Sequence, residues 1–119
     1  MILGHSLKVC LAVEPCDMRK SFEGLSAIVS QHLKEDVVSR KLYVFTNKRR
    51  TRVKLLYWDG TGLWVMAKRL EKGSFQWPRT LQSKDGKAAI KPEALEMLLS
   101  GIDLKDGMSR AWYEDPHPY

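Results

Sequence analysis

Two runs of alternating polar and apolar residues, 52–58 and 63–68, are separated by the turn sequence Asp-Gly-Thr-Gly at residues 59–62. Gly and Asp accept the backbone angles that a tight reversal requires, so this segment predicts a β-hairpin. Whether the tip is 59–60 or 60–61, even-numbered residues of the first strand pair with odd-numbered residues of the second. The chain is therefore expected to contain an antiparallel sheet.

This pairing assigns each hairpin residue to one of two faces. The first face holds Val53, Leu55, Tyr57, Trp64, Met66 and Lys68, and the second holds Arg52, Lys54, Leu56, Trp58, Leu63, Val65, Ala67 and Arg69. The first face is the more apolar and is expected to face the core. The second mixes positive charge with a tryptophan, which is typical of a sheet that contacts nucleic acid or a partner. Its apolar residues would equally suit a face covered by helices.

Other strands follow from residue alternation and from the residues that end each run. Strands are expected over 8–13 and 41–46, and a short edge strand around 75–77, which Pro78 would end.

A first helix is expected to begin at an N-cap on Asp17 and to run to about Leu33. Its apolar side chains Phe22, Leu25 and Val29 recur at three- and four-residue steps, so they should pack on the sheet. A second helix is expected to begin at Pro92 and to end before Gly101, because Pro suits the first helical position and Gly the position after the C-cap.

A chain of 119 residues is long enough for one compact core. The predicted fold is a single α+β domain over residues 1–104, with a mostly antiparallel sheet, one helix after the first strand and a C-terminal helix. Residues 105–119 show no regular pattern and are expected to form a mobile tail. The chain has no apolar run long enough to span a membrane and no signal-peptide pattern, so a cytoplasmic location without membrane contact is expected.

Positive charge is concentrated in residues 40–79, which contain eleven of the twenty Lys and Arg residues and only two acids, Asp59 and Glu71. Such a concentration is typical of a surface that binds a polyanion, although a solvated basic surface would have the same composition. The candidate nucleic-acid-binding residues are Lys48, Arg49, Arg50, Arg52, Lys54, Lys68, Arg69 and Lys72.

Arrangements of residues that would support catalysis are not found. Two cysteines and three histidines lack metal-ligand spacing, and no phosphate-binding glycine loop or Ser-His-Asp motif is present. Asp17, Asp59 and Asp103 are assigned structural roles as helix cap, hairpin-turn residue and residue after a helix end. The chain is thus expected to be no enzyme and to need no metal or cofactor.

Five segments of the chain carry a family resemblance: 17–25 (DMRKSFEGL), 42–45 (LYVF), 54–63 (KLLYWDGTGL), 68–78 (KRLEKGSFQWP) and 98–103 (LLSGID). In this order and spacing they closely resemble the TnpB accessory-protein family of the bacterial insertion-sequence family numbered sixty-six. The resemblance extends from about residue 8 to residue 104. Arg40 and Leu104 depart from it, since many such sequences have a glycine and an aromatic residue there.

The resemblance implies that the protein assists DNA transposition beside a separate transposase, with no established enzymatic activity. The leading hypothesis is a non-catalytic accessory factor that contacts transposon-end DNA through the basic hairpin. The alternative is a protein-interaction module that docks on the transposase or another transposon-encoded subunit, with Trp58 and Trp77 as anchors. A small nuclease is a third and weaker hypothesis.

Overall fold

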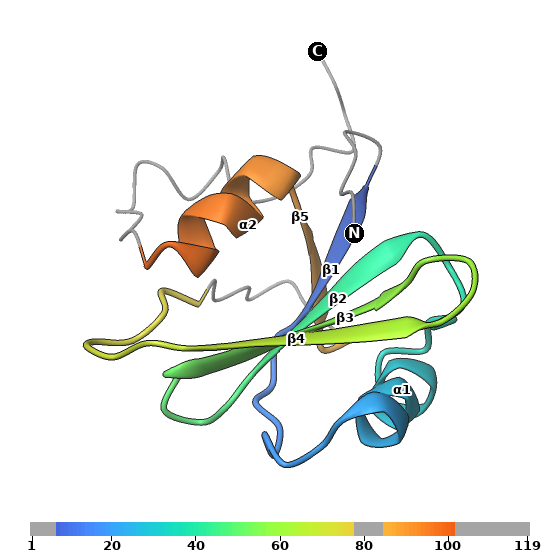
Figure 1. Cartoon of the computed structure of the whole chain (residues 1–119), viewed down its shortest axis with the longest axis horizontal. Helices are drawn as coiled ribbons and strands as arrows, with labels where there is room; N and C mark the ends of the chain where they lie inside the picture. The colour runs from blue at the N-terminus through green and yellow to red at the C-terminus, as the bar shows by residue number, and fades with distance from the viewer. Residues whose placement is uncertain (1–6, 78–84, 102–119) are drawn as a thin grey trace.

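A five-stranded sheet with one helix on each face forms the part of the chain that the computed structural model describes, residues 7–77 and 85–101 (Figure 1). In chain order the elements are β1 (Lys8–Ala12), α1 (Phe22–Gln31), β2 (Lys41–Thr46), β3 (Arg52–Trp58), β4 (Leu63–Arg69), β5 (Lys87–Ile90) and α2 (Pro92–Leu99). The strand order is β4-β3-β2-β1-β5, with β1 parallel to β2 and the other neighbours antiparallel. The predicted α+β fold with a mostly antiparallel sheet is confirmed.

The β3–β4 hairpin has the predicted register, with Arg52 opposite Arg69 and Trp58 opposite Leu63. Its turn is fixed by the Asp59 carboxylate, which accepts hydrogen bonds from the Thr61 amide at 2.8 Å, the Gly62 amide at 2.9 Å and the Trp64 indole at 2.7 Å. Hydrogen bonds from Thr61, Trp64 and Gly62 hold the pKa of this carboxyl well below its usual range. Asp59 is therefore the turn residue that the sequence predicted.

Both faces of the sheet are buried at its centre, because β1 and β2 are parallel and the connection between them carries α1 over one face while α2 covers the other (Figure 1). The cluster on the α1 face contains Cys10, Ala12, Leu25, Val29, Leu33, Tyr43, Phe45 and Leu56. The cluster on the α2 face contains Leu7, Val9, Leu11, Leu42, Val44, Val53, Leu55, Phe75, Trp77, Ile90, Ala94, Leu95 and Leu98. Residues of both hairpin faces thus enter the core.

The start of the first helix differs from the prediction. α1 begins at Phe22, and the Asp17 carboxylate instead accepts hydrogen bonds from the Arg19 amide at 2.8 Å and the Arg19 guanidinium at 2.6 Å. This local turn satisfies the side chain that was expected to cap the helix. Phe22 therefore lies in the first turn and is 48% exposed, so its assignment to the core was wrong, whereas Leu25 and Val29 are buried as predicted.

The short strand lies later in the chain than predicted. Residues 75–77 form no strand, and Phe75 and Trp77 instead bury their rings in the core cluster on the α2 face. The strand that completes the sheet is β5, which pairs antiparallel with β1. Its four residues, Lys-Ala-Ala-Ile, carry little β signal of their own, so the pairing with β1 decides their conformation.

The second helix begins and ends as predicted. Pro92 occupies the first turn of α2, and Gly101 follows the C-cap Ser100 with a φ of +77°. The Gly101 amide donates to the carbonyl of Leu98 at 3.0 Å, which closes the last turn. Asp103 and the expected mobile tail, 105–119, lie outside the described residues.

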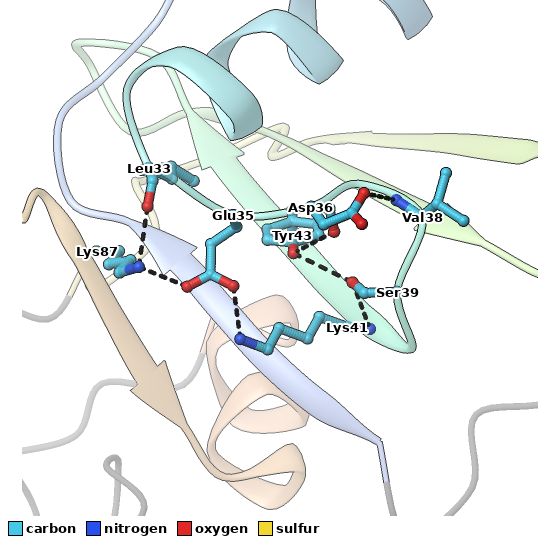
Figure 2. Close-up of polar contacts among 8 residues, drawn as sticks. All are labelled: Leu33, Glu35, Asp36, Val38, Ser39, Lys41, Tyr43 and Lys87. Atoms are coloured by element: carbon cyan, nitrogen blue, oxygen red, sulfur yellow. Dashed lines mark hydrogen bonds and ion pairs between the residues drawn. The ribbon is translucent and has the colours of Figure 1, made fainter.

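A polar cluster joins the segment after α1 to two strands (Figure 2). The Glu35 carboxylate accepts hydrogen bonds from Lys41 of β2 at 2.6 Å and from Lys87 of β5, and Lys87 also donates to the Leu33 carbonyl at 2.9 Å. The Glu35 side chain is only 17% exposed. Burial alone would raise its pKa, but the hydrogen bonds from the two lysines lower the pKa of Glu35 below its usual value.

We expect Glu35→Gln to lower the free energy of unfolding at neutral pH by about 1–3 kcal/mol, because an amide offers one acceptor where two ammonium groups need two. A carboxylate with a lowered folded pKa stabilises the protein above its unfolded pKa of about 4.3, and this stabilisation is lost as the pH falls through the folded value. The difference in the free energy of unfolding between the wild type and Glu35→Gln, measured by urea denaturation, should thus shrink below about pH 4. Glu96→Gln, on the exposed face of α2, is the control and should change stability by less than about 0.5 kcal/mol.

Candidate nucleic-acid interface

One end of the α1 face is left open by the helix, at the end of the hairpin farthest from its turn. Arg52 and Arg69 lie directly opposite each other there, and Lys54 is opposite Ala67. Arg52 and Arg69 are exposed and Lys54 is half-buried. These residues line a shallow depression together with Met18 and Glu71. The hairpin thus supports three cations on one face beside a small apolar floor.

The turn between β2 and β3 adds two exposed cations, Lys48 and Arg49. The Asn47 side chain fixes this turn by accepting hydrogen bonds from the amides of Thr51 at 2.9 Å and Arg52 at 3.1 Å. A second depression, lined among others by Met18, Lys48, Arg49 and Arg52, shares Met18 and Arg52 with the first. We call Lys48, Arg49, Arg52, Lys54 and Arg69 together the basic surface.

Within the basic surface, the direct pairing of Arg52 with Arg69 is electrostatically unfavourable, since like charges opposite each other in a sheet destabilise it. Two described acids lie nearby: Glu71 accepts from Arg69 at 3.3 Å, with both side chains well exposed, and Asp17, which lines the second depression, pairs with Arg19. Lys54 donates to the main-chain carbonyl of Lys20 at 2.6 Å and so holds the segment before α1 against the sheet. A bound polyanion would relieve the repulsion that Glu71 only partly offsets.

Three of the candidate residues are not part of the basic surface: Lys68, Arg50 and Lys72. Lys68 belongs to the opposite face, where its ammonium donates to the Leu99 carbonyl at the C-terminus of α2 at 2.6 Å, a favourable place for a cation. Arg50 is half-buried, has a φ of +58° and accepts a hydrogen bond from the Phe75 amide through its carbonyl. Lys72 is exposed in the loop after β4. The ammonium of Lys68 is therefore held on the face opposite to Arg52 and Arg69, although Lys68 also lines the first depression.

The two tryptophans named as partner anchors have different environments. Trp77 is only 5% exposed, and its indole donates to the Ala12 carbonyl at 3.1 Å, so it belongs to the core and offers a partner no surface. Trp58 is half-buried at the turn end of β3. The exposed aromatic of the hairpin is Trp64, which is 45% exposed and which the alternation had placed toward the core.

The described residues offer little for other chemistry. Burial raises the pKa of the Cys10 thiol to about 11 and also raises the pKa of Cys16, so neither thiol gains the thiolate character of a nucleophile. Residues 7–77 and 85–101 contain no group of three His, Cys, Asp or Glu side chains that could hold a metal ion. Within the same ranges, no helix has the length and apolarity to cross a membrane.

Comparisons with known proteins identify the family. Two proteins of Sinorhizobium fredii (strain NBRC 101917 / NGR234), the uncharacterized proteins y4jC and y4hO, are each 36% identical to this chain. The match covers 83% of this chain and 82% of y4jC, and 84% of both this chain and y4hO. No solved structure matches. The profile of the IS66 Orf2 like proteins matches residues 7–108, and this chain therefore belongs to the IS66 Orf2 like protein family.

Proposed function

We propose that this protein is a non-catalytic accessory factor of DNA transposition and that it binds DNA through the basic surface. Membership of the IS66 Orf2 like family supports the accessory role in transposition. The pairing of Arg52 with Arg69, beside Lys54 on the open end of the α1 face, carries the DNA-binding part of the proposal. Cations are held side by side there at an electrostatic cost that a phosphate backbone would offset.

The arrangement of cations in the basic surface is better suited to contact the phosphate backbone of DNA than the edges of its bases. Lys48 and Arg49 lie on a turn, and the other three cations lie on a sheet that α1 partly shields, so no helix or ribbon of the described residues presents side chains suited to enter a groove. Contacts of this kind supply affinity and position the protein, but they carry little sequence information. Transposon-end DNA and unrelated duplexes should therefore bind with similar affinity.

The expected result of a salt titration follows from the five cations of the basic surface. If each neutralises one phosphate, the logarithm of the association constant should fall with the logarithm of the salt concentration with a slope of about −4 to −5. Fluorescence anisotropy with a labelled 20-base-pair duplex measures this slope directly. Binding that is absent at low salt, or that does not depend on salt, would contradict the proposal.

The positions of the described acids support the absence of catalysis. Asp17 pairs with Arg19, Glu71 pairs with Arg69, and Asp59 lies in the turn at the other end of the hairpin, whereas two-metal cleavage of DNA needs several converging carboxylates. We expect supercoiled plasmid to remain uncut after incubation with the protein and magnesium or manganese. Cleavage that copurifies with the protein and is lost in Asp59→Asn would contradict this part of the proposal.

A docking module for the transposase is the rival function, and it has lost one of its two anchors because Trp77 is buried. The two functions differ in their response to salt, since phosphate binding weakens steeply with salt and an apolar interface does not. Association with the transposase that is insensitive to salt, without any binding to DNA, would favour the rival.

A further inference from the structure

Among the described residues, the outer edge of β4 is the less protected of the two edges of the sheet. β4 is seven residues long, contains no proline, and lies at the end of the strand order, where no strand of the described residues pairs with its outer side (Figure 1). The opposite edge strand, β5, has only four residues. Unpaired amides and carbonyls along a strand of this length form a template on which another strand can pair.

The hydrogen bonds at the two ends of the hairpin show which groups are available. The Leu70 amide donates to the Thr51 carbonyl and the Asp59 amide to the Gly62 carbonyl, so these are hydrogen-bonded pairs of the ladder. Hydrogen-bonded and non-hydrogen-bonded pairs alternate along an antiparallel ladder. The main-chain groups that point away from β3 therefore belong to Leu63, Val65, Ala67 and Arg69.

We propose that the β4 edge pairs antiparallel with β4 of a second copy of this chain, around a two-fold axis at Met66. Met66 is the middle residue of the strand, so this register pairs all seven residues. It places Val65 opposite Ala67 of the second copy and Leu63 opposite Arg69 of the second copy. These are the residues whose main-chain groups point outward.

The distribution of charge along β4 favours a second copy as the partner and antiparallel as the direction of pairing. Both cations of β4, Lys68 and Arg69, lie at its C-terminal end, and its N-terminal end is uncharged. Antiparallel pairing separates the cations of the two copies, whereas parallel pairing would set them side by side. Lys68 of one copy would then lie across from the 45% exposed Trp64 of the other, where its aliphatic stem can cover the indole while its ammonium stays at the Leu99 carbonyl.

Self-pairing would bring two basic surfaces together for DNA binding, a consequence that rests on the proposed function. An axis perpendicular to the sheet keeps the α1 faces of both copies on the same side, so both basic surfaces face one way. Arg69 lies three residues from the axis, which separates the two Arg69 positions by roughly 20 Å along the strands. That distance matches roughly six base pairs of duplex, so one duplex can contact both copies.

The self-pairing is tested on the full chain without DNA, so its failure is distinct from a failure of DNA binding. Sedimentation equilibrium should give a dimer for the wild type and half that mass for Ala67→Pro, which removes an outward-pointing amide while leaving the pairing with β3 intact. Ala67→Thr keeps this amide and should remain dimeric. Circular dichroism reports whether each variant is folded.

A disulfide at Met66 tests the register and does not depend on the proline variant. A non-hydrogen-bonded antiparallel pair brings its Cα atoms to about 4.5 Å, which suits a disulfide. Met66→Cys should therefore form an intermolecular disulfide on mild oxidation. Trp64→Cys should not, because it faces Lys68 of the second copy, and the wild type controls for Cys10 and Cys16.

Three outcomes would overturn the inference. One is a folded wild-type protein that stays monomeric at every concentration measured. Another is a dimer that Ala67→Pro leaves unchanged and that Met66→Cys does not cross-link. The third is hydrogen exchange at β4 that slows only when the transposase is added to a monomeric protein, which would show that the edge receives a foreign strand.

Discussion

Replacing Phe45 by Ala should lower the free energy of unfolding by about 3–5 kcal/mol, because the deleted ring leaves a cavity that its neighbours cannot close. Phe45 is fully buried in the middle strand of the sheet, within the cluster that α1 covers. A loss of this size is a large fraction of the total stability of a domain of this length. Urea denaturation followed by circular dichroism measures it.

Phe22→Ala is the matched comparison, since the same atoms are removed from the same residue type on the helix that covers Phe45. Phe22 is 48% exposed, so the change should cost about 1 kcal/mol or less. A loss at Phe22 as large as that at Phe45 would contradict the position of the α1 start. Near-neutral behaviour of Phe45→Ala would contradict the buried cluster itself.

The second large effect concerns the proposed binding of DNA through Arg49 and Arg52. Changing both to Ala should weaken binding at 0.1 M salt by roughly 60-fold, because each lost phosphate contact lowers the logarithm of the association constant by about 0.9 per decade of salt below 1 M. The loss should be similar for transposon-end and unrelated duplexes. Both side chains are exposed, so the melting temperature should stay nearly unchanged.

Arg40→Ala with Lys91→Ala is the charge-matched control. Arg40 precedes β2 and Lys91 follows β5, and the strand register places both at the end of the sheet opposite the basic surface. This pair removes the same total charge, so its effect should be limited to long-range attraction and should be far smaller than 60-fold. Equal losses in the two double variants would indicate that only net charge matters.

The sequence predicted the hairpin well because its signals are local. Gly60 adopts a positive φ in a two-residue turn, Asp59 binds the amides that follow it, and alternation then determines the register. The same holds for α2, where Pro92 and Gly101 have conformational preferences that require no tertiary partner. Such residues specify local structure directly.

The features that the sequence did not predict depend on contacts between distant segments. Asp17 had the residue type of a helix cap but binds Arg19, and β5 is a strand because β1 lies beside it. Trp77 becomes a core residue only because the chain after β4 folds back over the α2 face, where its indole reaches Ala12. These contacts leave no periodic signal in a single sequence.

The candidate site likewise has features that the sequence predicted and features that depend on contacts between distant segments. Alternation placed Arg52, Lys54 and Arg69 on one face, and the structure agrees. The same alternation already placed Lys68 on the other face, and only the position of α2 shows that the Leu99 carbonyl receives its ammonium. Charge density in the sequence therefore indicated the candidate region, and the packing of the helices determined which cations share a surface.

The difference in salt dependence between the two double variants tests DNA binding by the basic surface most directly. Relative to wild type, Arg49→Ala with Arg52→Ala should flatten the slope of the logarithm of the association constant against the logarithm of salt concentration by about 2, since two phosphate contacts are lost. Arg40→Ala with Lys91→Ala should leave the slope unchanged. The same slope for wild type and both double variants would contradict a DNA interface at the basic surface.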